Sequence, residues 1–574
     1  MWRSVQALLR SPDWDGPNGW HEVAIKEIDQ VIKVKKALIF SSHAQYVAAR
    51  AAYPATFEIL NLVVVATQKQ RANGDFTRKK FRITIADVNR PGTKFVGETF
   101  SPTVDDTFVR FVANATLGRP RGTRRILDVK GAYFEGSTVP ASAGGRNLWI
   151  PVPLGWDALG YPSHTGGLRN YFNAVGNAPG LRDAGRAFYL VYAAWLADNG
   201  FKQSIVERCL FYRHSPSGAL AIICVYVDDN WTYFEDDSEW DAFYARWSLR
   251  FRESQNVLEA GDDFCGVSYD SRPDGTLHLS CCKLLQALAD IIAPYPVAAP
   301  CASPMNSDML VRMRQPKSAT NPDFPDKIST ARSILGLGMY VVRGARPDGL
   351  FAAVAIAPFI VVNLTADVWE ALLHWATYLV RSHLRTLVLR PVPFSARLNF
   401  CASSDSSAIN VPLADSASIG LTGFEALPVA SMGGYALFFA GSGAFSVECF
   451  SPRTLGDSSQ SAELTMSVWA SKAIIAFRIA LRELKLGPDG PTELQLDAKA
   501  VLDGAGMEKV ARRQRYQAVR LAMLRQWIAD GVLRLKKVNT ADMPSDILSK
   551  PVAPVGQFHR LAGILLTGKA PSEA

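Results

Sequence analysis

The sequence predicts a folded chain of several domains in the mixed α+β and α/β classes. Of its 574 residues, 48% are hydrophobic and 20% are charged, which supplies enough apolar side chains for several cores. Its first part contains apolar, β-branched runs joined by turns, as in β-hairpins. Beyond a Pro-containing linker at residues 390–394, strand and helix patterns alternate as in a compact α/β domain.

The centre of the predicted first part is residues 219–234, ALAIICVYVDDNWTYF. Two apolar runs flank Asp228-Asp229-Asn230, a pattern typical of a hairpin with buried arms and an open tip. Adjacent carboxylates repel each other unless a cation lies between them or water solvates them. By itself the stretch fits a metal site and a solvated acidic turn equally well.

A third carboxylate favours the metal site. Residues 124–134, RRILDVKGAYF, predict a short apolar strand that ends at Asp128 and turns at Gly131. Carboxylates from two strands are what two-metal phosphoryl transfer needs, since one ion activates the attacking hydroxyl and the other stabilises the leaving pyrophosphate.

These motifs resemble those of reverse transcriptases. Residues 226–229 are similar to the YVDD box, and residues 127–133 are similar to the first catalytic motif in the form used by copia-type LTR retrotransposons. The resemblance implies a right-hand polymerase with fingers, palm and thumb/connection. It also implies that Asp128, Asp228 and Asp229 are catalytic and that Asp128 and Asp228 hold Mg²⁺.

The resemblance also indicates residues that contact the nucleotide. Lys80-Phe81-Arg82 matches a K-x-R signature, so Lys80 and Arg82 are expected to reach the triphosphate; the alternative is a solvated basic strand edge. Tyr133 is expected to lie beneath the ribose and to exclude ribonucleotides; the alternative is a core aromatic residue.

A further segment, residues 180–188, is similar to G-L-K-Q-x-P-R-x-W and supplies Arg186 as a substrate-binding residue. Asp183 stands where the family has Gln, and Gly185 stands where it has Pro, in a region implied to lie under the template and the nucleotide. Other matches follow in the family's order, at residues 97–104, 147–156, 264–267 and 331–352.

Four acidic residues mark a second site at the ends of predicted elements. Asp405 follows a strand at 398–403, Glu463 lies in the first turn of a helix at 461–486, Asp497 closes a strand at 493–496, and Asp546 opens the last helix. Taken one at a time, these residues have simpler explanations, because acidic side chains are also common at helix N-termini and in turns.

Residues 458–463, 496–497 and 545–551 resemble the copia-type ribonuclease H motifs, in the right order. The resemblance implies that Asp405, Glu463, Asp497 and Asp546 are catalytic and hold two Mg²⁺ that cut the RNA of a hybrid by in-line water attack. Between these motifs, Arg513 and Arg515 belong to a basic stretch suited to phosphate contacts.

Composition limits the other possibilities. A net charge of +9 and a pI near 9.0 are compatible with a polyanionic partner without establishing one. The eight cysteines form no CxxC pair, which predicts reduced core residues of an intracellular protein and no zinc site.

The first 16 residues lack a signal-peptide pattern, and the longest apolar run, 351–362, is shorter than the ~20 residues that span a bilayer. No membrane segment is predicted.

The resemblance assigns five regions: an N-terminal extension (1–50), fingers and palm (51–300), thumb/connection (301–395), a ribonuclease H-like domain (396–560) and a tail (561–574). We expect an RNA-directed DNA polymerase with ribonuclease H activity that uses two Mg²⁺ per active site, with Mn²⁺ as a substitute. The expected partners are RNA template, DNA primer, RNA–DNA hybrid, deoxyribonucleoside triphosphates, and other retrotransposon proteins such as capsid and integrase. The expected location is a cytoplasmic virus-like particle or the nucleus.

Two alternatives stay open. The changes at Asp183 and Gly185 favour a decayed or domesticated copy that binds RNA–DNA without catalysis, whereas the retained carboxylates disfavour it. A basic structural protein of a particle would need no carboxylate set. Because no CCHC knuckle, aspartic-protease box or integrase segment precedes the matched region, we expect a fragment, a cut reading frame or a divergent locus.

Overall fold

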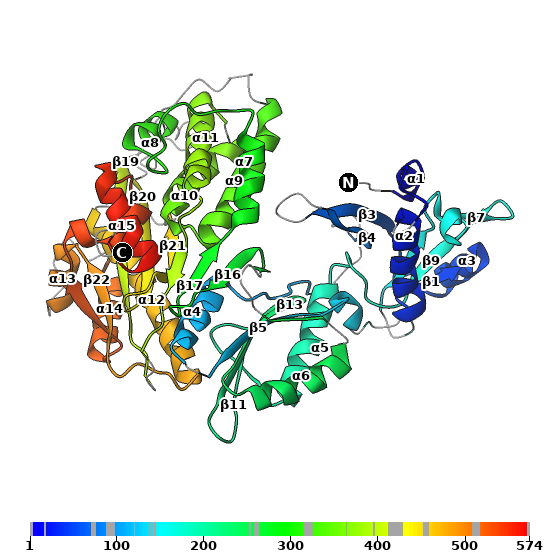
Figure 1. Cartoon of the computed structure of the whole chain (residues 1–574), viewed down its shortest axis with the longest axis horizontal. Helices are drawn as coiled ribbons and strands as arrows, with labels where there is room; N and C mark the ends of the chain where they lie inside the picture. Colours follow the sequence, from blue (N-terminus) through cyan, green and yellow to red (C-terminus); the bar gives the residue numbers. More distant parts are fainter. Residues whose placement is uncertain are drawn as a thin grey trace.

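The structure is a computed structural model, which describes residues 4–16, 19–70, 76–87, 98–119, 121–136, 138, 142, 145–251, 254–257, 263–314, 325–362, 364–393, 397–410, 429–451, 459–507 and 517–570. Helices and strands are mixed along the whole chain, so the predicted α+β and α/β class is confirmed. In Figure 1 the first elements form a body on the right, a sheet follows in the centre, and the remaining elements form a larger body on the left.

The N-terminal body has its own hydrophobic core, which includes Trp20, Trp156 and Phe172. A four-stranded sheet of order β1-β9-β6-β2 and two hairpins, β3-β4 and β7-β8, form its β structure. Its elements are α1 (Val5–Leu8), α2 (Trp20–Asp29), the π-helix η1 (Gln30–Val34), β1 (Leu38–Ser41), α3 (His43–Ala52), β2 (Phe57–Ile59), β3 (Asn61–Gln70), β4 (Phe76–Ala86), β6 (Asn147–Pro151), η4 (Trp156–Leu159), β7 (His164–Thr165), β8 (Leu168–Arg169) and β9 (Tyr171–Ala174).

The β3-β4 hairpin reaches from this body towards the central sheet (Figure 1). The central sheet is antiparallel, with the order β10-β11-β12-β13-β5-β14. The apolar, β-branched composition of residues 220–226 explains why β12 forms a buried central strand. The elements are α4 (Asp106–Leu117), β5 (Thr123–Asp128), η2 (Ala132–Glu135), α5 (Ala184–Asp198), β10 (Lys202–Gln203), β11 (Leu210–His214), β12 (Leu220–Tyr226), β13 (Asp229–Phe234), α6 (Asp237–Phe251) and β14 (Ser254–Val257).

A small sheet of order β15-β16-β17-β18 and a group of helices follow. Within this group, Asp348 is fully buried and pairs with Arg346 through two hydrogen bonds of 2.9 and 2.8 Å. The elements are β15 (Asp263–Phe264), β16 (Val267–Ser271), β17 (Leu277–Ser280), α7 (Cys282–Ile292), α8 (Ser307–Arg314), η5 (Pro325–Lys327), α9 (Ile328–Gly344), η6 (Pro347–Gly349), α10 (Leu350–Val362), α11 (Ala366–Arg381) and β18 (Leu387–Leu389).

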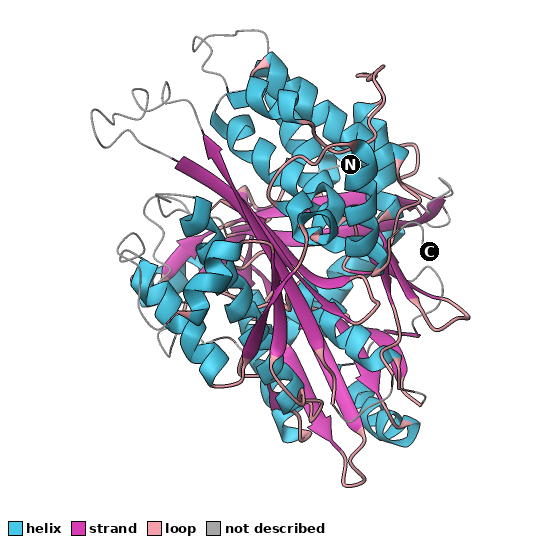
Figure 2. Cartoon of the chain, turned by 90° about the vertical axis from the view of Figure 1, so that its left-hand side faces the viewer, coloured by secondary structure: helices cyan, strands magenta, loops and turns pink. Residues whose placement is uncertain are grey.

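The C-terminal part is built on a mixed sheet of order β21-β20-β19-β22-β23, with β19 antiparallel to β20 and parallel to β22. Helix α12 packs on β19 and β20, and helices lie on both sides of the long strands (Figure 2). Its elements are β19 (Phe400–Asn410), β20 (Val429–Phe439), β21 (Ala444–Phe450), α12 (Ser459–Glu483), β22 (Thr492–Leu496), α13 (Lys499–Gly506), α14 (Ala518–Ala529), β23 (Leu533–Lys537), η10 (Thr540–Asp542), η11 (Pro544–Leu548) and α15 (Val555–Thr567).

Three of the predicted positions in this part need correction. Asp405 lies inside β19, because this strand continues to Asn410 in its pairing with β20. Glu463 is the fifth residue of α12, just beyond the first turn. Asp546 lies in the short 3₁₀ helix η11, and the last helix is α15. The division of the chain into domains stays a prediction, and its 560/561 boundary falls within α15.

One described helix, α12, is long and apolar enough to cross a membrane by length and composition. Of its most apolar 18-residue window, 67% is buried inside the protein. That burial is typical of a core helix, so its length and composition are weak evidence for a membrane span.

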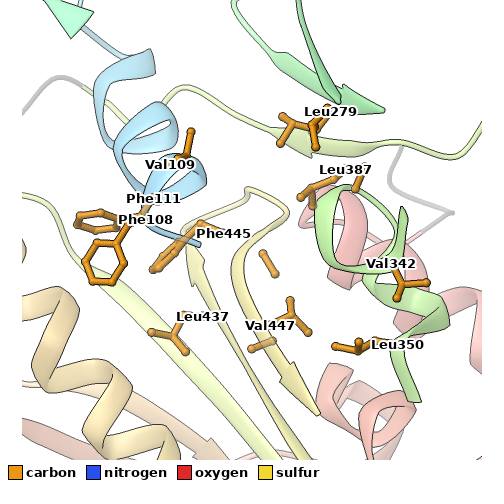
Figure 3. Packing of buried hydrophobic residues seen from close by; sticks show 14 of the residues in the cluster. Phe108, Val109, Phe111, Leu279, Val342, Leu350, Leu387, Leu437, Phe445 and Val447 are labelled. Carbon is orange, nitrogen blue, oxygen red and sulfur yellow. The ribbon is translucent and has the colours of Figure 1, made fainter. Parts of the chain in front are cut away.

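A single hydrophobic core joins the central sheet, the helical group and the C-terminal part. Phe111 of α4 packs its ring 4.9 Å from that of Phe477 of α12 and 5.4 Å from that of Phe445 of β21. Figure 3 shows Phe108 and Phe111 of α4 beside Phe445, with Val342 and Leu350 of the helical group in the same region. Helix α4 therefore belongs to the core of the C-terminal part as much as to that of the central sheet.

Polar contacts reinforce this junction. The buried Arg110 of α4 donates to the Phe445 carbonyl (3.0 Å) and to the Arg343 carbonyl (2.7 Å). At the end of α12, Glu483 accepts from the Ser204 hydroxyl (2.6 Å) and from the Ile205 backbone N–H (2.9 Å). The bonds of Arg110 and Ser204 satisfy polar side chains that the junction buries.

We expect Phe111→Ala to lower the free energy of unfolding by about 3–5 kcal/mol, because it leaves a cavity where three parts of the chain meet. Leu249→Ala is the matched control, since this side chain is 83% exposed, and a change within about 0.5 kcal/mol is expected. Urea denaturation followed by tryptophan fluorescence measures both variants. Equal losses for the two variants would show that α4 is not part of a shared core.

Candidate active sites

The first candidate site lies at the tip of the β12-β13 hairpin. Tyr226 pairs with Asp229, so Val227 and Asp228 form a two-residue turn. Val227 has φ 54°, a left-handed conformation that is strained by roughly 1–3 kcal/mol for such a residue. The hairpin that the sequence predicted is therefore confirmed, and its strain lies directly before Asp228.

Buried hydrogen bonds hold this turn against β5. The Asp228 carbonyl accepts from the Val129 backbone N–H (2.9 Å) and from the side-chain amide of Asn230 (3.0 Å). Asn230 is completely buried and also donates to the Leu127 carbonyl (3.4 Å). Asn230 was not singled out as functional from the sequence, although its place after the paired carboxylates was visible there.

The three predicted carboxylates meet at this tip. Asp128 ends β5 and pairs directly with Asp229 of β13. Burial raises the pKa of Asp229 to about 6, and the charges of Asp228 and Asp128 add to the rise. Burial also raises the pKa of Asp228, where the charge of Asp128 again adds. Carboxylates that lie this close together repel one another, and a divalent cation between them would relieve the repulsion.

The predicted basic pair lies near these carboxylates. Lys80 and Arg82 are two positions apart on β4, and both act to lower the pKa of Asp228. Lys80 is half-buried and Arg82 is exposed. This placement brings positive charge from the N-terminal body to the acidic tip, where it would favour binding of an anion. The predicted contact of Lys80 and Arg82 with a triphosphate stays a prediction.

Tyr133 lies in η2, beyond the turn at Gly131, whose φ of 69° is left-handed. Its side chain is half-buried. Burial raises the pKa of Tyr133, the charge of Asp228 adds to the rise, and Arg82 lowers it. Tyr133 thus lies within electrostatic range of both a candidate metal ligand and a candidate triphosphate contact. Its role as a sugar gate stays a prediction.

The start of α5 lies close to Tyr133. A side-chain carbon at Gly185 would be 3.6 Å from the Tyr133 ring and 3.2 Å from the Ser101 Cβ. Arg186 forms a 2.5 Å ion pair with Glu98 and donates to the Phe100 carbonyl (3.1 Å). The structure therefore places Arg186 against residues 98–101, and its role in substrate binding stays a prediction.

Replacing Tyr133 by Val should raise ribonucleotide use relative to deoxyribonucleotide use by more than roughly tenfold, about 1.4 kcal/mol of lost discrimination. An aromatic ring beneath the sugar excludes a 2′-hydroxyl by overlap, and a smaller side chain leaves room for it. Steady-state kinetics with dTTP and UTP on an rA template measure the ratio of kcat/KM values. An unchanged ratio in an otherwise active variant would show that Tyr133 is not the gate.

The second candidate site brings together Asp405, Glu463 and Asp497. One carboxylate oxygen from each lies within 4.8 Å of the other two. The parallel pairing of β19 and β22 explains this, since Ser403 lies opposite Gln495 and the two aspartates each follow two residues later. Within the described ranges, this is the one group of three acidic, His or Cys side chains with that spacing.

Asp405 is buried, Glu463 and Asp497 are half-buried, and the hydrogen bonding of the group is incomplete. Asp405 is 1% exposed and accepts from the Ser549 hydroxyl. One Glu463 oxygen accepts from the Ser406 backbone N–H (3.2 Å), whereas the other, Oε2, is buried and has no hydrogen-bond partner among the residues that the structure describes. Burial raises the pKa of Glu463, and the charges of Asp405 and Asp497 add to the rise. An unpaired buried carboxylate oxygen beside two more carboxylates fits a divalent cation.

Asp546 lies beside this group, against Asp405. Burial raises the pKa of Asp546, and the charge of Asp405 adds to the rise. Gly434, which pairs with Asp405, permits this packing, because a side-chain carbon there would lie 2.4 Å from the Leu548 Cβ. All four predicted nuclease carboxylates therefore meet at one place, three of them within the metal-binding spacing.

Sequence reasoning missed Lys550. Its ammonium lies 3.2 Å from Asp546 Oδ1 and 3.4 Å from Asp405 Oδ2. The signal was present, because Lys550 follows Asp546 by four residues, a spacing at which opposite charges can pair. Arg513 and Arg515 lie outside the described residues, so their predicted phosphate contacts stay predictions.

Curated plant proteins show sequence similarity over most of the chain. The chain is 25% identical over 524 residues to the retrovirus-related Pol polyprotein from transposon RE2 of Arabidopsis thaliana, covering 89% of the chain and 32% of that protein. It is 21% identical over 501 residues to the retrovirus-related Pol polyprotein from transposon TNT 1-94 of Nicotiana tabacum. This match covers 86% of the chain and 34% of that protein. The chain spans about a third of the length of these relatives. No protein-family model matches it.

The similarity to solved structures is weaker. A foamy viral protease-reverse transcriptase in complex with dsDNA is 11% identical, with a TM-score of 0.40, covering 90% of this chain and 83% of that one. Ribonuclease H1 from the archaeon Halobacterium salinarum is 15% identical, with a TM-score of 0.19. This match covers 26% of this chain and 94% of the ribonuclease. The sequence similarity and the ordered motifs agree in one respect: the chain is similar to copia-type retrotransposon Pol polyproteins.

Proposed function

We propose that the chain is an RNA-directed DNA polymerase that also degrades the RNA of the resulting hybrid. The observation that carries this proposal is the presence of two separate carboxylate groups. Asp128, Asp228 and Asp229 meet at a hairpin tip, and a second group of four meets on the C-terminal sheet. A binding or structural protein would have no need for either group.

In the polymerase site, Asp128 and Asp228 would hold Mg²⁺, with Asp229 beside them. Bound there, two such ions supply activation of the primer hydroxyl and charge stabilisation at the leaving pyrophosphate. The Val129 and Asn230 hydrogen bonds keep the Asp228 turn fixed relative to Asp128. Lys80 and Arg82 of β4 would bind the triphosphate, and Tyr133 would select its sugar.

In the nuclease site, Asp405, Glu463, Asp497 and Asp546 would hold two Mg²⁺, or Mn²⁺ in its place. Bound there, the ions would supply activation of a water for in-line attack on an RNA phosphodiester. Hydrogen bonds hold two of these carboxylates in position: the Ser549 hydroxyl donates to Asp405, and the Ser406 backbone N–H donates to Glu463. Asp405 and Asp497 are further fixed by the pairing of β19 with β22.

The proposed partners are an RNA template with a DNA primer, the resulting hybrid, and deoxyribonucleoside triphosphates. The net charge of +9 favours such polyanions. Capsid and integrase are proposed as further partners, and a cytoplasmic particle or the nucleus as the location.

A single reaction tests the proposal. The purified chain is incubated with a 5′-labelled RNA annealed to a DNA primer that carries a different label, together with the four deoxyribonucleoside triphosphates and Mg²⁺. Both strands are then followed on a gel. Primer elongation and RNA shortening are expected, and chelation with EDTA should stop both. Tight hybrid binding with neither product would instead support the decayed, non-catalytic copy that Asp183 and Gly185 suggest.

A further inference from the structure

Lys550 bridges Asp405 and Asp546, which form one half of the proposed nuclease site. Its ammonium contacts both Asp405 and Asp546, at 3.4 and 3.2 Å, and its backbone N–H donates to the Asp546 carbonyl (3.2 Å). Ser549, the preceding residue, donates its hydroxyl to the same Asp405 oxygen that Lys550 contacts. These contacts fix two buried carboxylates next to each other, an arrangement that is costly without a cation between them.

The other half of the site is different. Glu463 lies on α12, and Asp497 directly follows β22. Each offers a carboxylate oxygen close to that of Asp405, and Glu463 Oε2 has no hydrogen-bond partner within the described part of the chain. The half formed by Asp405, Glu463 and Asp497 thus contains a buried oxygen without a hydrogen-bond partner among the described residues, whereas the half formed by Asp405 and Asp546 contains the Lys550 charge. Asp405 belongs to both halves.

The Lys550 side chain is able to leave this position. Its side chain is 37% exposed, whereas the side chains of Asp405 and Asp546 are 2% and 6% exposed. Its unbranched stem has several rotatable bonds, so the ammonium can turn out into water while the two carboxylates stay in place.

We propose that Lys550 is a positioning residue that acts as a tethered cation: it holds Asp546 against Asp405 and competes with the second divalent ion for this half of the nuclease site. The inference rests on the proposed nuclease function. It follows that the first ion binds between Asp405, Glu463 and Asp497 without displacing any protein cation. Binding of the second ion requires Lys550 to turn away.

Mn²⁺ binding to the full chain tests this inference, with free Mn²⁺ measured by electron paramagnetic resonance. Lys550→Met and Lys550→Gln remove the charge, and Lys550→Arg keeps it. Lys472→Met, an exposed position on α12, controls for the change in net charge. The two neutral variants should bind the second nuclease-site Mn²⁺ about tenfold or more tightly, since a competing charge at about 3 Å is gone. Lys550→Arg and Lys472→Met should follow the wild type.

A melting curve adds a second readout. Without metal, the neutral Lys550 variants should melt at a lower temperature than the wild type, and saturating Mn²⁺ should close the gap. A residue that only supports the fold would show the lower melting temperature without tighter Mn²⁺ binding, and that result would overturn the inference. Asp497→Asn separates the two claims: if it leaves the Mn²⁺ isotherm unchanged, the proposed nuclease site itself is wrong.

Discussion

Asp228→Asn is expected to reduce Mg²⁺-dependent primer extension by at least about a thousandfold, because it removes a metal ligand that acts in the transition state. Asn keeps the shape of the side chain and its backbone contacts, including the hydrogen bonds of the Asp228 carbonyl to Val129 and Asn230. The strained turn at Val227 should therefore persist, and hybrid binding should change little. Extension of a labelled primer and a filter-binding assay measure the two quantities.

Asp241→Asn is the matched control for this variant. Asp241 is an exposed residue of α6, so the same change of charge there should leave extension at the wild-type rate. Undiminished extension by Asp228→Asn would rule out its assignment as a metal ligand.

Asp497→Asn should stop cleavage of the RNA in a hybrid and spare DNA synthesis. Asp497 is one of the three residues whose carboxylate oxygens lie within 4.8 Å of one another, and it follows β22, which is absent from the central sheet. The loss of cleavage should again reach at least about a thousandfold, as expected for a ligand in two-metal catalysis.

The nuclease and polymerase sites share a hydrophobic core, so a control for folding is needed in this experiment. Unchanged primer extension by Asp497→Asn supplies it, because a damaged core at α4 would affect both sites. RNA cleavage that survives in this variant would refute the nuclease assignment, whereas a parallel loss of both activities would show that the sites are not independent.

Short-range patterns were well predicted from the sequence. The hairpin of β12 and β13 follows from two apolar runs around an acidic turn. The convergence of Asp128 with Asp228 and Asp229 followed from strand ends and family motifs. These features depend on local periodicity and turn chemistry, which the sequence contains directly.

Features that depend on packing were not predicted. The extension of β19 beyond Asp405 comes from its pairing with β20. Gly434 of β20 lies opposite Asp405, and its lack of a side chain permits η11 to pack against these two strands. The core shared through Phe111 joins residues separated by more than 300 positions in the chain, and no local pattern indicates it. Lys550 was visible four residues after Asp546, but its contact with Asp405 required the fold.

Extension of oligo(dT) on poly(rA) by the purified full-length chain is the most direct test of the central claim. The wild-type protein should lengthen the primer with dTTP and Mg²⁺, and Asp228→Asn should not. A folded wild-type protein that binds the poly(rA)/oligo(dT) hybrid but does not lengthen the primer with Mg²⁺ or Mn²⁺ would contradict the polymerase assignment.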